Sequence, residues 1–395
     1  MENNRNPNKM KICFICNEYP PMYAGGIGIF VKNLAEALAC KGNNVHVLGY
    51  GRKQTQPELI NGVKVHYIWL PHPLYKKIKI SGHQYSIAYL LRRHYLSFKI
   101  NRLLKQQRFD LVESYDFSGP LARKPKCKFI VRLHGATLVY RFGEGRPDNI
   151  NPLQRHFEIS NVKMADHVIA VSQHIGKLTN QVMGLDKPYQ VIYNSVDTDL
   201  FSPQNIKPDH KCILFIGNMM WRKGVFDLIR AMPFILQKHP DAHLKIAGGS
   251  SGIHKVQLNK TLLEVEESVS DHIHLLGRVP HKELPALYNR SSVFVFPSRV
   301  EAFGLTCAEA MACGRPVVAT SMASGPELIE EGISGLIADP TTPEDLAAKI
   351  CVVLEDPALG QRLGRAARER ALALFDLEKN LNLNLDFYHK VLMSH

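Results

Sequence analysis

The chain has 395 residues, of which 45% are hydrophobic and 22% charged, and its formal net charge is +13. This length predicts two domains with ordinary buried cores. The composition excludes a mainly disordered chain, a collagen-like repeat and a small disulfide-stabilised scaffold. No apolar run approaches the ~18 residues that a membrane span needs, and the polar start MENNRNPNKM lacks the apolar core of a signal peptide. We therefore expect a cytoplasmic protein.

The positive charge is confined to one half of the chain. Residues 1–200 carry 28 Lys and Arg against 14 Asp and Glu, whereas residues 201–395 carry 21 against 22. Within the first half, residues 76–108 hold nine basic residues and no acidic one. Such a segment predicts an anionic partner. The charge alone leaves open whether this partner is a nucleic acid, an anionic membrane surface or an acidic substrate.

Short apolar runs alternate with longer amphipathic stretches along the chain. Strands are predicted in the first half at 11–16, 44–50, 64–70, 110–114, 128–134, 167–172 and 189–193. After a polar, proline-containing stretch the pattern restarts, with strands at 212–217, 243–248, 273–277, 293–298, 316–320 and 335–338. Helical stretches between them, such as 29–42 and 225–240, indicate parallel sheets covered on both faces.

The fold class is therefore predicted to be α/β, with two Rossmann-like, doubly wound parallel-sheet domains that face each other across a cleft. We place the first domain at residues 1–200 and the second at 201–372. A C-terminal helix at 373–395 is expected to pack back on the first domain. Ligands of such sheets bind at the carboxyl ends of the strands, so the side chains and glycines that follow the strands are the candidates for function.

Two motifs of the first half follow predicted strands. Gly25, Gly26 and Gly28 come after the first strand and open a helix, where backbone N–H groups can approach an anion. Their spacing differs from the dinucleotide fingerprint and no acidic residue ends the strand 44–50, so a nicotinamide cofactor is disfavoured. His134 ends the strand 128–134 and is placed to meet a ligand in the cleft, with a structural histidine as the alternative.

Two further motifs lie in the second half. Arg222 and Lys223 precede a helix, where they could donate to a phosphate, the alternative being a solvated pair of cations. The strongest motif, residues 297–319, joins a strand, a glycine turn, a helix and another strand. Glu309 lies on an otherwise small and apolar part of this helix, so its carboxylate needs a hydrogen-bonding partner. A ribose diol would serve, whereas the sequence identifies no protein donor.

These residues, in this order, resemble the retaining nucleotide-sugar glycosyltransferases of family 4, which have the GT-B fold, over nearly the whole chain. The most specific part is the E-x7-E element from Glu301 to Glu309. The resemblance implies that Glu301 meets the donor sugar and that Glu309 binds the ribose hydroxyls. It further implies that the Gly25-Gly26 loop closes over the donor diphosphate, that His134 lies near the sugar, and that Lys223 binds the diphosphate.

Further site residues follow from the same resemblance and from their position. The backbone at Gly304 and Leu305 can direct N–H groups at phosphate, and the nucleotide base is expected near Arg278 and Val279. Asn218 stands where similar enzymes carry arginine, so Arg222 or Arg299 would have to supply the second cation. The acceptor-side candidates, at the end of the strand 110–114, are Glu113 and Asp116.

The resemblance implies transfer of a hexosyl or N-acetylhexosaminyl group with retention of configuration, a UDP-sugar being the favoured donor. The expected acceptor is a glycan, a polysaccharide precursor or a lipid-linked molecule. No metal and no other cofactor is expected, and no run of His, Asp and Glu has metal-ligand spacing. The alternatives are a catalytically silent glycosyltransferase-like scaffold and a membrane-associated binding protein.

The basic segment then becomes an acceptor-side feature. Residues 89–107 have helical spacing, with the apolar side chains of Tyr89, Leu90, Leu96, Ile100, Leu103 and Leu104 largely grouped. Because basic amphipathic helices bind anionic lipid surfaces, we expect peripheral binding to the inner face of the membrane through residues 76–108. A nucleic-acid partner is not expected, since no helix-turn-helix, zinc or RNA-binding signature appears.

Overall fold

The structure is a computed structural model that describes residues 9–20, 25–50, 56–68, 83–146, 148, 150–250 and 252–394, apart from the side chains at 83–90, 92 and 253. The chain divides into two compact units. The first unit comprises Met1–Val171, Ile175–Ile192 and Glu378–His395, and the second comprises Ser172–His174 and Tyr193–Leu377. The boundary lies after Ile192, before the predicted boundary at residue 200. Val196 already belongs to the second unit, because its backbone binds the segment that follows α14 (Pro357–Leu374). Its N–H donates to the carbonyl of Phe375 at 2.7 Å.

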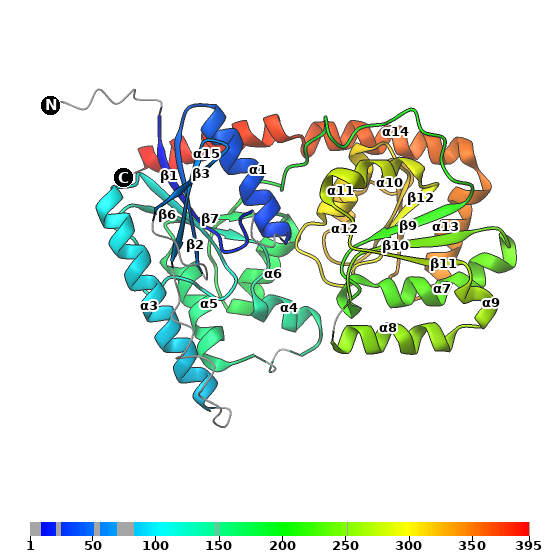
Figure 1. Ribbon diagram of the computed structural model, residues 1–395, viewed down its shortest axis with the longest axis horizontal. Helices are drawn as coiled ribbons and strands as arrows, with labels where there is room; N and C mark the ends of the chain where they lie inside the picture. Colours follow the sequence, from blue (N-terminus) through cyan, green and yellow to red (C-terminus); the bar gives the residue numbers. More distant parts are fainter. Residues whose placement is uncertain are drawn as a thin grey trace. The chain divides into compact units, whose positions relative to one another are not determined.

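The first unit is built on a sheet with the strand order β3-β4-β2-β1-β5-β6-β7-β8 (Figure 1). All neighbours are parallel except β3 and β4. The strands are β1 (Lys11–Ile15), β2 (Asn44–Tyr50), β3 (Glu58–Ile60), β4 (Val63–Ile68), β5 (Leu111–Tyr115), β6 (Lys128–Leu133), β7 (His167–Ala170) and β8 (Gln190–Val191). The sequence prediction lacks β3, although Asn61 and Gly62, with φ of 46° and 81°, form the Asn-Gly turn that is typical of a tight hairpin.

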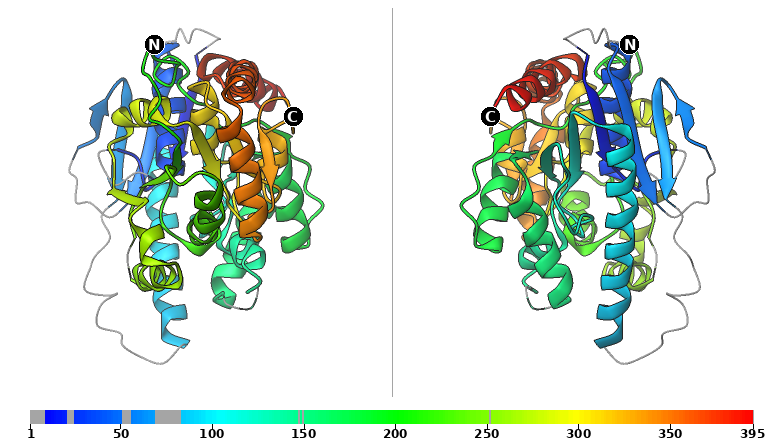
Figure 2. Two further views of the ribbon diagram at one scale, coloured as in Figure 1. Left: turned by 90° about the vertical axis from the view of Figure 1, so that its right-hand side faces the viewer. Right: turned by 90° about the vertical axis from the view of Figure 1, so that its left-hand side faces the viewer.

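Helices cover both faces of this sheet (Figures 1 and 2). One face packs against α1 (Gly26–Cys40) and α15 (Leu377–Met393), whose Leu381, Tyr388 and Val391 join the same apolar cluster as Ile12 and Phe14 of β1. The C-terminal helix thus packs on the first unit. The other helices are α3 (His83–Gln107), α4 (Thr137–Gly143), α5 (Pro152–Met164) and α6 (Gln173–Met183). Among the described residues, no helix has the length and apolar character required to cross a bilayer.

The second unit has a fully parallel sheet in the order β11-β10-β9-β12-β13-β14. Its strands are β9 (Cys212–Ile216), β10 (His243–Ala247), β11 (Ile273–Gly277), β12 (Val293–Phe296), β13 (Val317–Thr320) and β14 (Leu336–Ala338). Inward-facing residues such as Phe215, Leu244 and Val295 form one cluster with the apolar faces of the helices on that side. The helices are α7 (Val225–Lys238), α8 (Ile253–Glu264), α9 (Glu267–Ser270), α10 (Leu284–Arg290), α11 (Leu305–Ala312), α12 (Gly325–Leu328), α13 (Pro343–Glu355) and α14 (Pro357–Leu374).

Both sheets reverse their strand order once, and this reversal positions the candidate residues. In the first unit the reversal lies between β1 and β5, and in the second between β9 and β12. Loops on either side of such a point diverge, which leaves a crevice at the carboxyl ends of the strands. Gly25 and Asp116 follow β1 and β5, and Lys223 and Glu301 follow β9 and β12. The prediction of two doubly wound parallel-sheet domains is confirmed.

Candidate active site

The centre of the candidate site in the second unit is an ion pair between Lys223 and Glu301. Lys223 ends a 3-10 turn after β9, and Glu301 lies in the loop after β12. Their side chains are 22% and 12% exposed. Burial by itself would raise the pKa of the Glu301 carboxyl, but the charges of Lys223 and Arg222 hold this pKa below its ordinary value. Glu301 is therefore ionised at neutral pH.

The two loops that carry this pair are tied together through their backbones. The carbonyl of Arg222 accepts the N–H groups of Arg299 and Val300, at 2.9 and 3.2 Å. Gly224 has a φ of 70°, and a Cβ added to it would lie 1.8 Å from the carbonyl oxygen of Pro297. Only glycine allows the loops to approach this closely. Gly224, the residue next to Lys223, therefore allows the loops of Lys223 and Glu301 to come together.

The arginine that is missing at position 218 has one candidate substitute. Asn218 is exposed in the loop after β9. Arg299 makes a two-pronged ion pair with Asp227 of α7, at 3.0 and 2.8 Å, and its guanidinium lies 4.8 Å from the centre of the Trp221 ring. Arg299 is thus held by the first turn of α7. The charge of Arg222 contributes to the lowered pKa of Glu301, so the prediction of Arg222 as the second cation stays open.

The start of α11 adds backbone donors to the same loop. Gly304 is the residue before α11 and has a φ of 101°, and an added Cβ would lie 2.6 Å from the ring of Phe296. Leu305 opens the helix. The first N–H groups of a helix have no acceptor within it, and the helix dipole makes this end partly positive. Gly304 and Leu305 therefore stand where an anion such as a diphosphate would be stabilised.

Glu309, which lies further along α11, has protein partners that the sequence does not reveal. The hydroxyl of Tyr288 donates to one carboxylate oxygen at 2.8 Å, and Nε2 of His281 lies 3.1 Å from the other. The structure thus supplies the protein partners of Glu309 that could not be identified from the sequence. Tyr288 and His281 come from α10 and the turn before it, some distance away in the sequence. Each carboxylate oxygen has a second lone pair, so Glu309 can still accept from a diol.

Arg278 and Val279 directly follow β11 at the same edge of the sheet. Arg278 is exposed, and its Nε lies 2.9 Å from where a Cβ of Gly249 would be, so its side chain runs along the loop after β10. Val279 lies just ahead of the turn that carries His281. The predicted base-binding and ribose-binding residues are thus connected through His281.

In the first unit, the predicted phosphate loop is described only in part. Gly25 is the residue before α1 and Gly26 is its first residue. The N–H of Gly25 donates to the carboxylate of Glu18 at 3.2 Å. Residues 21–24 of this glycine-rich stretch lie outside the described residues. The positions of Gly25 and Gly26 agree with a helix N-terminus, and their role toward a donor stays a prediction.

His134 is a buried, neutral histidine with a firmly held backbone. Its ring packs on Phe30 of α1, with the ring centres 5.2 Å apart. Burial, and then the charge of Arg132, lower the pKa of His134 to about 3. The carboxylate of Asp116 accepts the N–H groups of His134 and Gly135, at 3.0 and 3.2 Å. Asp116, predicted as an acceptor-side candidate, is fully buried and positions the backbone of His134.

Glu113 does not lie on an acceptor surface. Its side chain is 3% exposed and forms an ion pair with Arg132, with contacts of 2.7 and 3.2 Å. The hydroxyl of Tyr388 donates to the same carboxylate at 2.7 Å. Arg132 also donates to Asn384, so the cluster joins β5 and β6 to α15. The burial and the partners of Glu113 contradict its prediction as an acceptor-side residue.

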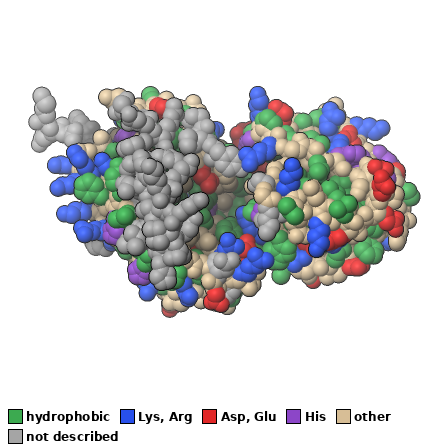
Figure 3. All heavy atoms as spheres, turned by 60° about the horizontal axis from the view of Figure 1, so that its bottom comes forward, with side chains coloured by type: hydrophobic (Ala, Val, Ile, Leu, Met, Phe, Trp, Pro, Cys, Tyr) green, Lys and Arg blue, Asp and Glu red, His purple; other side chains and the backbone are tan. Residues whose placement is uncertain are grey.

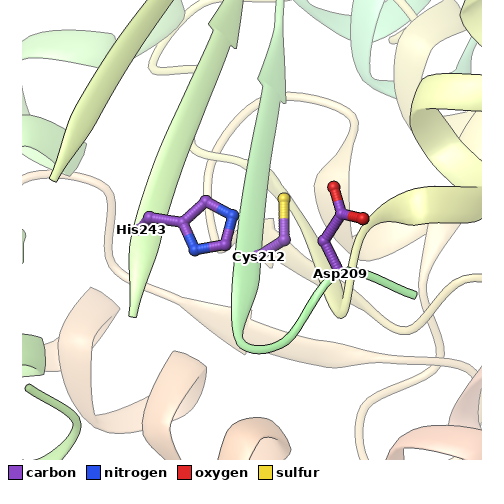
Figure 4. Close-up of side chains that lie close together, drawn as sticks. All are labelled: Asp209, Cys212 and His243. Atoms are coloured by element: carbon purple, nitrogen blue, oxygen red, sulfur yellow. The ribbon is translucent and has the colours of Figure 1, made fainter. Parts of the chain in front are cut away.

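A separate cluster of possible metal ligands lies at the opposite edge of the second sheet. Ligand atoms of Asp209, Cys212 and His243 all lie within 4.8 Å of one another (Figure 4). Cys212 and His243 begin β9 and β10, whereas Lys223 follows the other end of β9. The Asp209 carboxylate pairs with Lys245 at 2.6 Å, and burial raises the pKa of the Cys212 thiol to about 11. The cluster is not part of the candidate donor site, and a metal-free reaction stays a prediction.

The basic segment 76–108 is described from residue 83, where α3 begins, and the side chains of Tyr89 and Leu90 lie outside the described residues. Leu96, Ile100 and Leu104 are buried against the first unit. Arg93 is also buried: its guanidinium donates to the carbonyl of Gly119 at 2.7 Å and lies 3.7 Å from the centre of the Phe157 ring. Arg93 therefore holds α3 in place and is not available to a partner.

Comparisons with known proteins show the family to which the two units belong. The profile of Glycosyltransferase Family 4 matches residues 24–200, and that of Glycosyl transferases group 1 matches residues 196–370. The chain is 29% identical to an uncharacterized glycosyltransferase of Methanocaldococcus jannaschii over 366 residues, which are 88% of this chain and 90% of the relative.

Solved structures share the fold. The sucrose-phosphate synthase of Thermosynechococcus elongatus has a TM-score of 0.81 at 23% identity, covering 97% of this chain and 99% of that one. HepE of Anabaena, solved in complex with UDP-glucose, has a TM-score of 0.71 at 18% identity, covering 96% of this chain and 99% of that one. The two profile matches together run from residue 24 to residue 370, and the chain therefore belongs to the family 4 and group 1 glycosyltransferases with the GT-B fold.

Proposed function

We propose that this glycosyltransferase transfers a hexosyl or N-acetylhexosaminyl group with retention of configuration from a nucleotide sugar, most favourably a UDP-sugar, to a glycan, a polysaccharide precursor or a lipid-linked acceptor. The observation that carries the proposal is the pairing of Lys223 with Glu301 beside the N-terminus of α11, at the strand reversal of the second sheet. The complex of HepE with UDP-glucose supports a UDP-sugar donor, because that protein shares the fold.

The chemistry requires stabilisation of a leaving diphosphate. As the bond between the sugar carbon and the phosphate oxygen breaks, negative charge grows on the diphosphate. Lys223, Arg222 and the N–H groups at Gly304 and Leu305 supply positive charge and donors at this point. The acceptor hydroxyl attacks on the same face of the sugar, and its proton passes to the departing phosphate oxygen. No metal and no protein base is needed in this scheme.

The remaining residues orient the donor. The ionised Glu301 carboxylate faces the donor sugar, whose ring becomes positive in the transition state. Glu309, held by Tyr288 and His281, accepts the ribose hydroxyls, and the segment of Arg278 and Val279 meets the base. In the first unit, His134 is a neutral hydrogen-bonding group toward the sugar, and the Gly25-Gly26 turn at the start of α1 closes over the diphosphate.

The test combines donor binding with transfer. Purified protein is screened against a panel of nucleotide sugars by thermal shift, since a bound ligand raises the melting temperature. The preferred donor is then used in transfer and donor-hydrolysis assays on Lys223→Ala and Glu301→Ala, with Lys282→Ala as a surface control. We expect kcat/KM to fall at least about 100-fold in both site variants. Undiminished rates in both would overturn the residue assignment, and NMR of the product anomer decides retention.

A second candidate function rests on Asn218. Where similar enzymes place an arginine, this chain has an amide, which weakens the expected pair of cations on the diphosphate. A catalytically silent scaffold would bind the nucleotide sugar without turnover. A melting-temperature shift with a donor, together with no transfer or hydrolysis by the wild-type protein, would favour this function.

A further inference from the structure

The first unit contains a pocket of about 480 Å³ that is lined by basic residues. Its wall combines the C-terminal end of α3 with the segment that leads into β6. Arg108 and Phe109 come just before β5, and residues 123–127 come just before β6. The pocket therefore lies at the amino-terminal edge of the sheet. His134 and Asp116 follow the opposite ends of these strands, so the pocket is separate from the edge of the sheet that carries His134.

The charge of the pocket is strongly one-sided. Five cationic side chains line it and no acidic one does, the cations being Lys105, Arg108, Arg123, Lys124 and Lys126. Lys124 pairs with Asp166. Within the described part of the chain, no acidic side chain forms an ion pair with the other four. A nearby carboxylate, that of Asp110, accepts the backbone N–H of Lys11 at 2.7 Å. Asp110 and Asp166 therefore offset only part of the charge of the five cations, and the excess of positive charge fits an anion.

The floor of the pocket is apolar. Leu104 and Phe109 are both 6% exposed, and Cys127 completes this surface. A fully hydrated inorganic anion gains nothing from such a surface. An anion that carries an apolar chain places its charged group among the cations and its first methylene groups against Leu104 and Phe109.

The outer face of α3 reaches this pocket at Lys105. Leu91, His94, Phe98, Arg102 and Lys105 recur every three or four positions and so share one face of the helix. Leu91 is 53% and Phe98 63% exposed, an unusual exposure for side chains of this size. Arg102 and Lys105 are exposed on the same face. Figure 3 shows Lys and Arg side chains with hydrophobic ones between them along the edge where Figure 1 places α3.

We infer that the pocket binds the phosphate headgroup of an anionic membrane phospholipid while the outer face of α3 lies in the headgroup region. The cations of the pocket neutralise the phosphate, and Leu91 and Phe98 enter the boundary of the acyl chains. This inference rests on the proposed function only in that a membrane-bound acceptor gives the contact its purpose. It assigns the contact to a pocket that takes no part in sugar transfer.

The test is flotation of the full chain with vesicles of phosphatidylcholine, with and without 30 mol% phosphatidylglycerol. The pocket variant is Arg123→Gln combined with Lys126→Gln. Its control is Arg155→Gln combined with Lys177→Gln, which removes the same charge from exposed positions of the same unit. Because each cation near an anionic surface strengthens binding about fivefold, we expect the pocket variant to bind about thirtyfold more weakly and the control to change less than about threefold. Equal losses would show general charge attraction and overturn the pocket.

The apolar part of the inference has its own pair of variants. Leu91→Ser should weaken binding to the anionic vesicles about tenfold, because a leucine that enters the lipid boundary is lost. Leu263→Ser, at an 87% exposed leucine of the second unit, should leave binding unchanged. If Leu91→Ser bound the anionic vesicles as tightly as the wild type, the placement of α3 in the headgroup region would be wrong.

Two further measurements distinguish a failure of the lipid-binding inference from a failure of the proposed function. Titration with glycerol phosphate and inorganic phosphate asks whether a soluble anion occupies the pocket, and tight binding of either without vesicle binding would overturn the lipid assignment. Donor hydrolysis by the pocket variant should equal that of the wild type. A loss of hydrolysis only in Lys223→Ala and Glu301→Ala, with vesicle binding intact, would support the proposed function independently of the membrane contact.

Discussion

At the scale of single residues, the structure divides the buried carboxylates into groups that face the candidate site and groups that support it. Glu301 pairs with Lys223 and is ionised beside the start of α11. Asp116 instead accepts two backbone N–H groups and so holds the loop that carries His134. The two roles call for different kinetic effects when the carboxylate is changed.

For Asp116→Asn we expect kcat to fall about 10- to 100-fold while the affinity for the donor stays within twofold. An asparagine can accept only one of the two N–H groups, so His134 shifts, and displacements of about 1 Å have effects of this size on rates. The residues of the second unit that are proposed to bind the donor are unchanged. Transfer kinetics and a donor-binding titration measure the two quantities, with the exposed Asp186→Asn as control. A loss of donor affinity equal to the loss of kcat would contradict this positioning role.

A buried histidine pair makes the first unit sensitive to acid. Nδ1 of His46 lies 2.9 Å from Nε2 of His66, and burial, followed by the charges of His66 and nearby lysines, lowers the pKa of His46 to about 3. Its value in the unfolded chain is about 6.5. Between these values the unfolded state binds a proton that the folded state does not, so stability falls as the pH decreases below 6.5.

We therefore expect the free energy of unfolding to fall by about 2 kcal/mol between pH 6.5 and pH 5 through His46. Urea unfolding of the wild type and of His46→Gln at several pH values measures this term as the difference between the two proteins. Asp116, whose pKa is raised to about 7 mainly by burial, has the opposite pH dependence but is common to both proteins. An equal pH dependence in wild type and variant would contradict the assignment.

At the scale of elements, the loops after β9 and β12 pack against each other and are joined by backbone hydrogen bonds. The carbonyl of Pro297 lies against Gly224, and the carbonyl of Arg222 binds the backbone of the other loop. The ion pair of Lys223 and Glu301 depends on this contact. Strain introduced at Gly224 should therefore affect both stability and donor binding.

For Gly224→Ala we expect a loss of at least about 3 kcal/mol of stability in the second unit and a loss of donor binding. The left-handed backbone alone costs an alanine roughly 1–2 kcal/mol, and the clash with Pro297 adds to this cost. Gly332→Ala is a matched control in the same unit, since Gly332 has a φ of 74° and no atom within 4 Å of its added Cβ. Chemical denaturation and thermal shift with the donor measure both effects. Similar losses in the two variants would show that the loop contact is unimportant.

At the scale of the whole molecule, the C-terminal helix returns to the first unit through a buried polar cluster. Arg132, Glu113 and Tyr388 link β6, β5 and α15, with Arg132 1% and Glu113 3% exposed. A buried ion pair contributes little by itself, but removing one partner leaves an unpaired charge. The cluster therefore adds to the docking of α15 that the apolar side chains of Leu381 and Val391 provide.

We expect Glu113→Gln to destabilise the first unit by about 3–5 kcal/mol, and Tyr388→Phe by only about 1–2 kcal/mol. Hydrogen exchange measured by mass spectrometry locates the loss, which should fall on peptides from β5, β6 and α15. The thermal shift with the donor should persist, because the predicted donor residues belong to the second unit. Faster exchange in β9 or β12, or a loss of donor binding, would contradict this separation.

The sequence by itself determined the order of strands and helices, the two doubly wound sheets, and the positions of Lys223, Glu301 and Glu309 after the strands. These features are local, because apolar runs, glycine turns and short motifs act on the residues next to them. Even β3 has a local signal in Asn61 and Gly62. The sequence shows Gly224, which joins the loops after β9 and β12. It does not show the close contact of Gly224 with Pro297.

Only the tertiary structure decided which partners each charged group has. Tyr288 and His281 hold Glu309, Asp227 holds Arg299, and Glu113 and Asp116 support the first unit instead of facing an acceptor. On α3 the sequence shows a run of cations without showing that Arg93 is buried. Each of these outcomes depends on residues that are distant in the chain, and the energy of a charge depends on burial and on neighbours that only packing supplies.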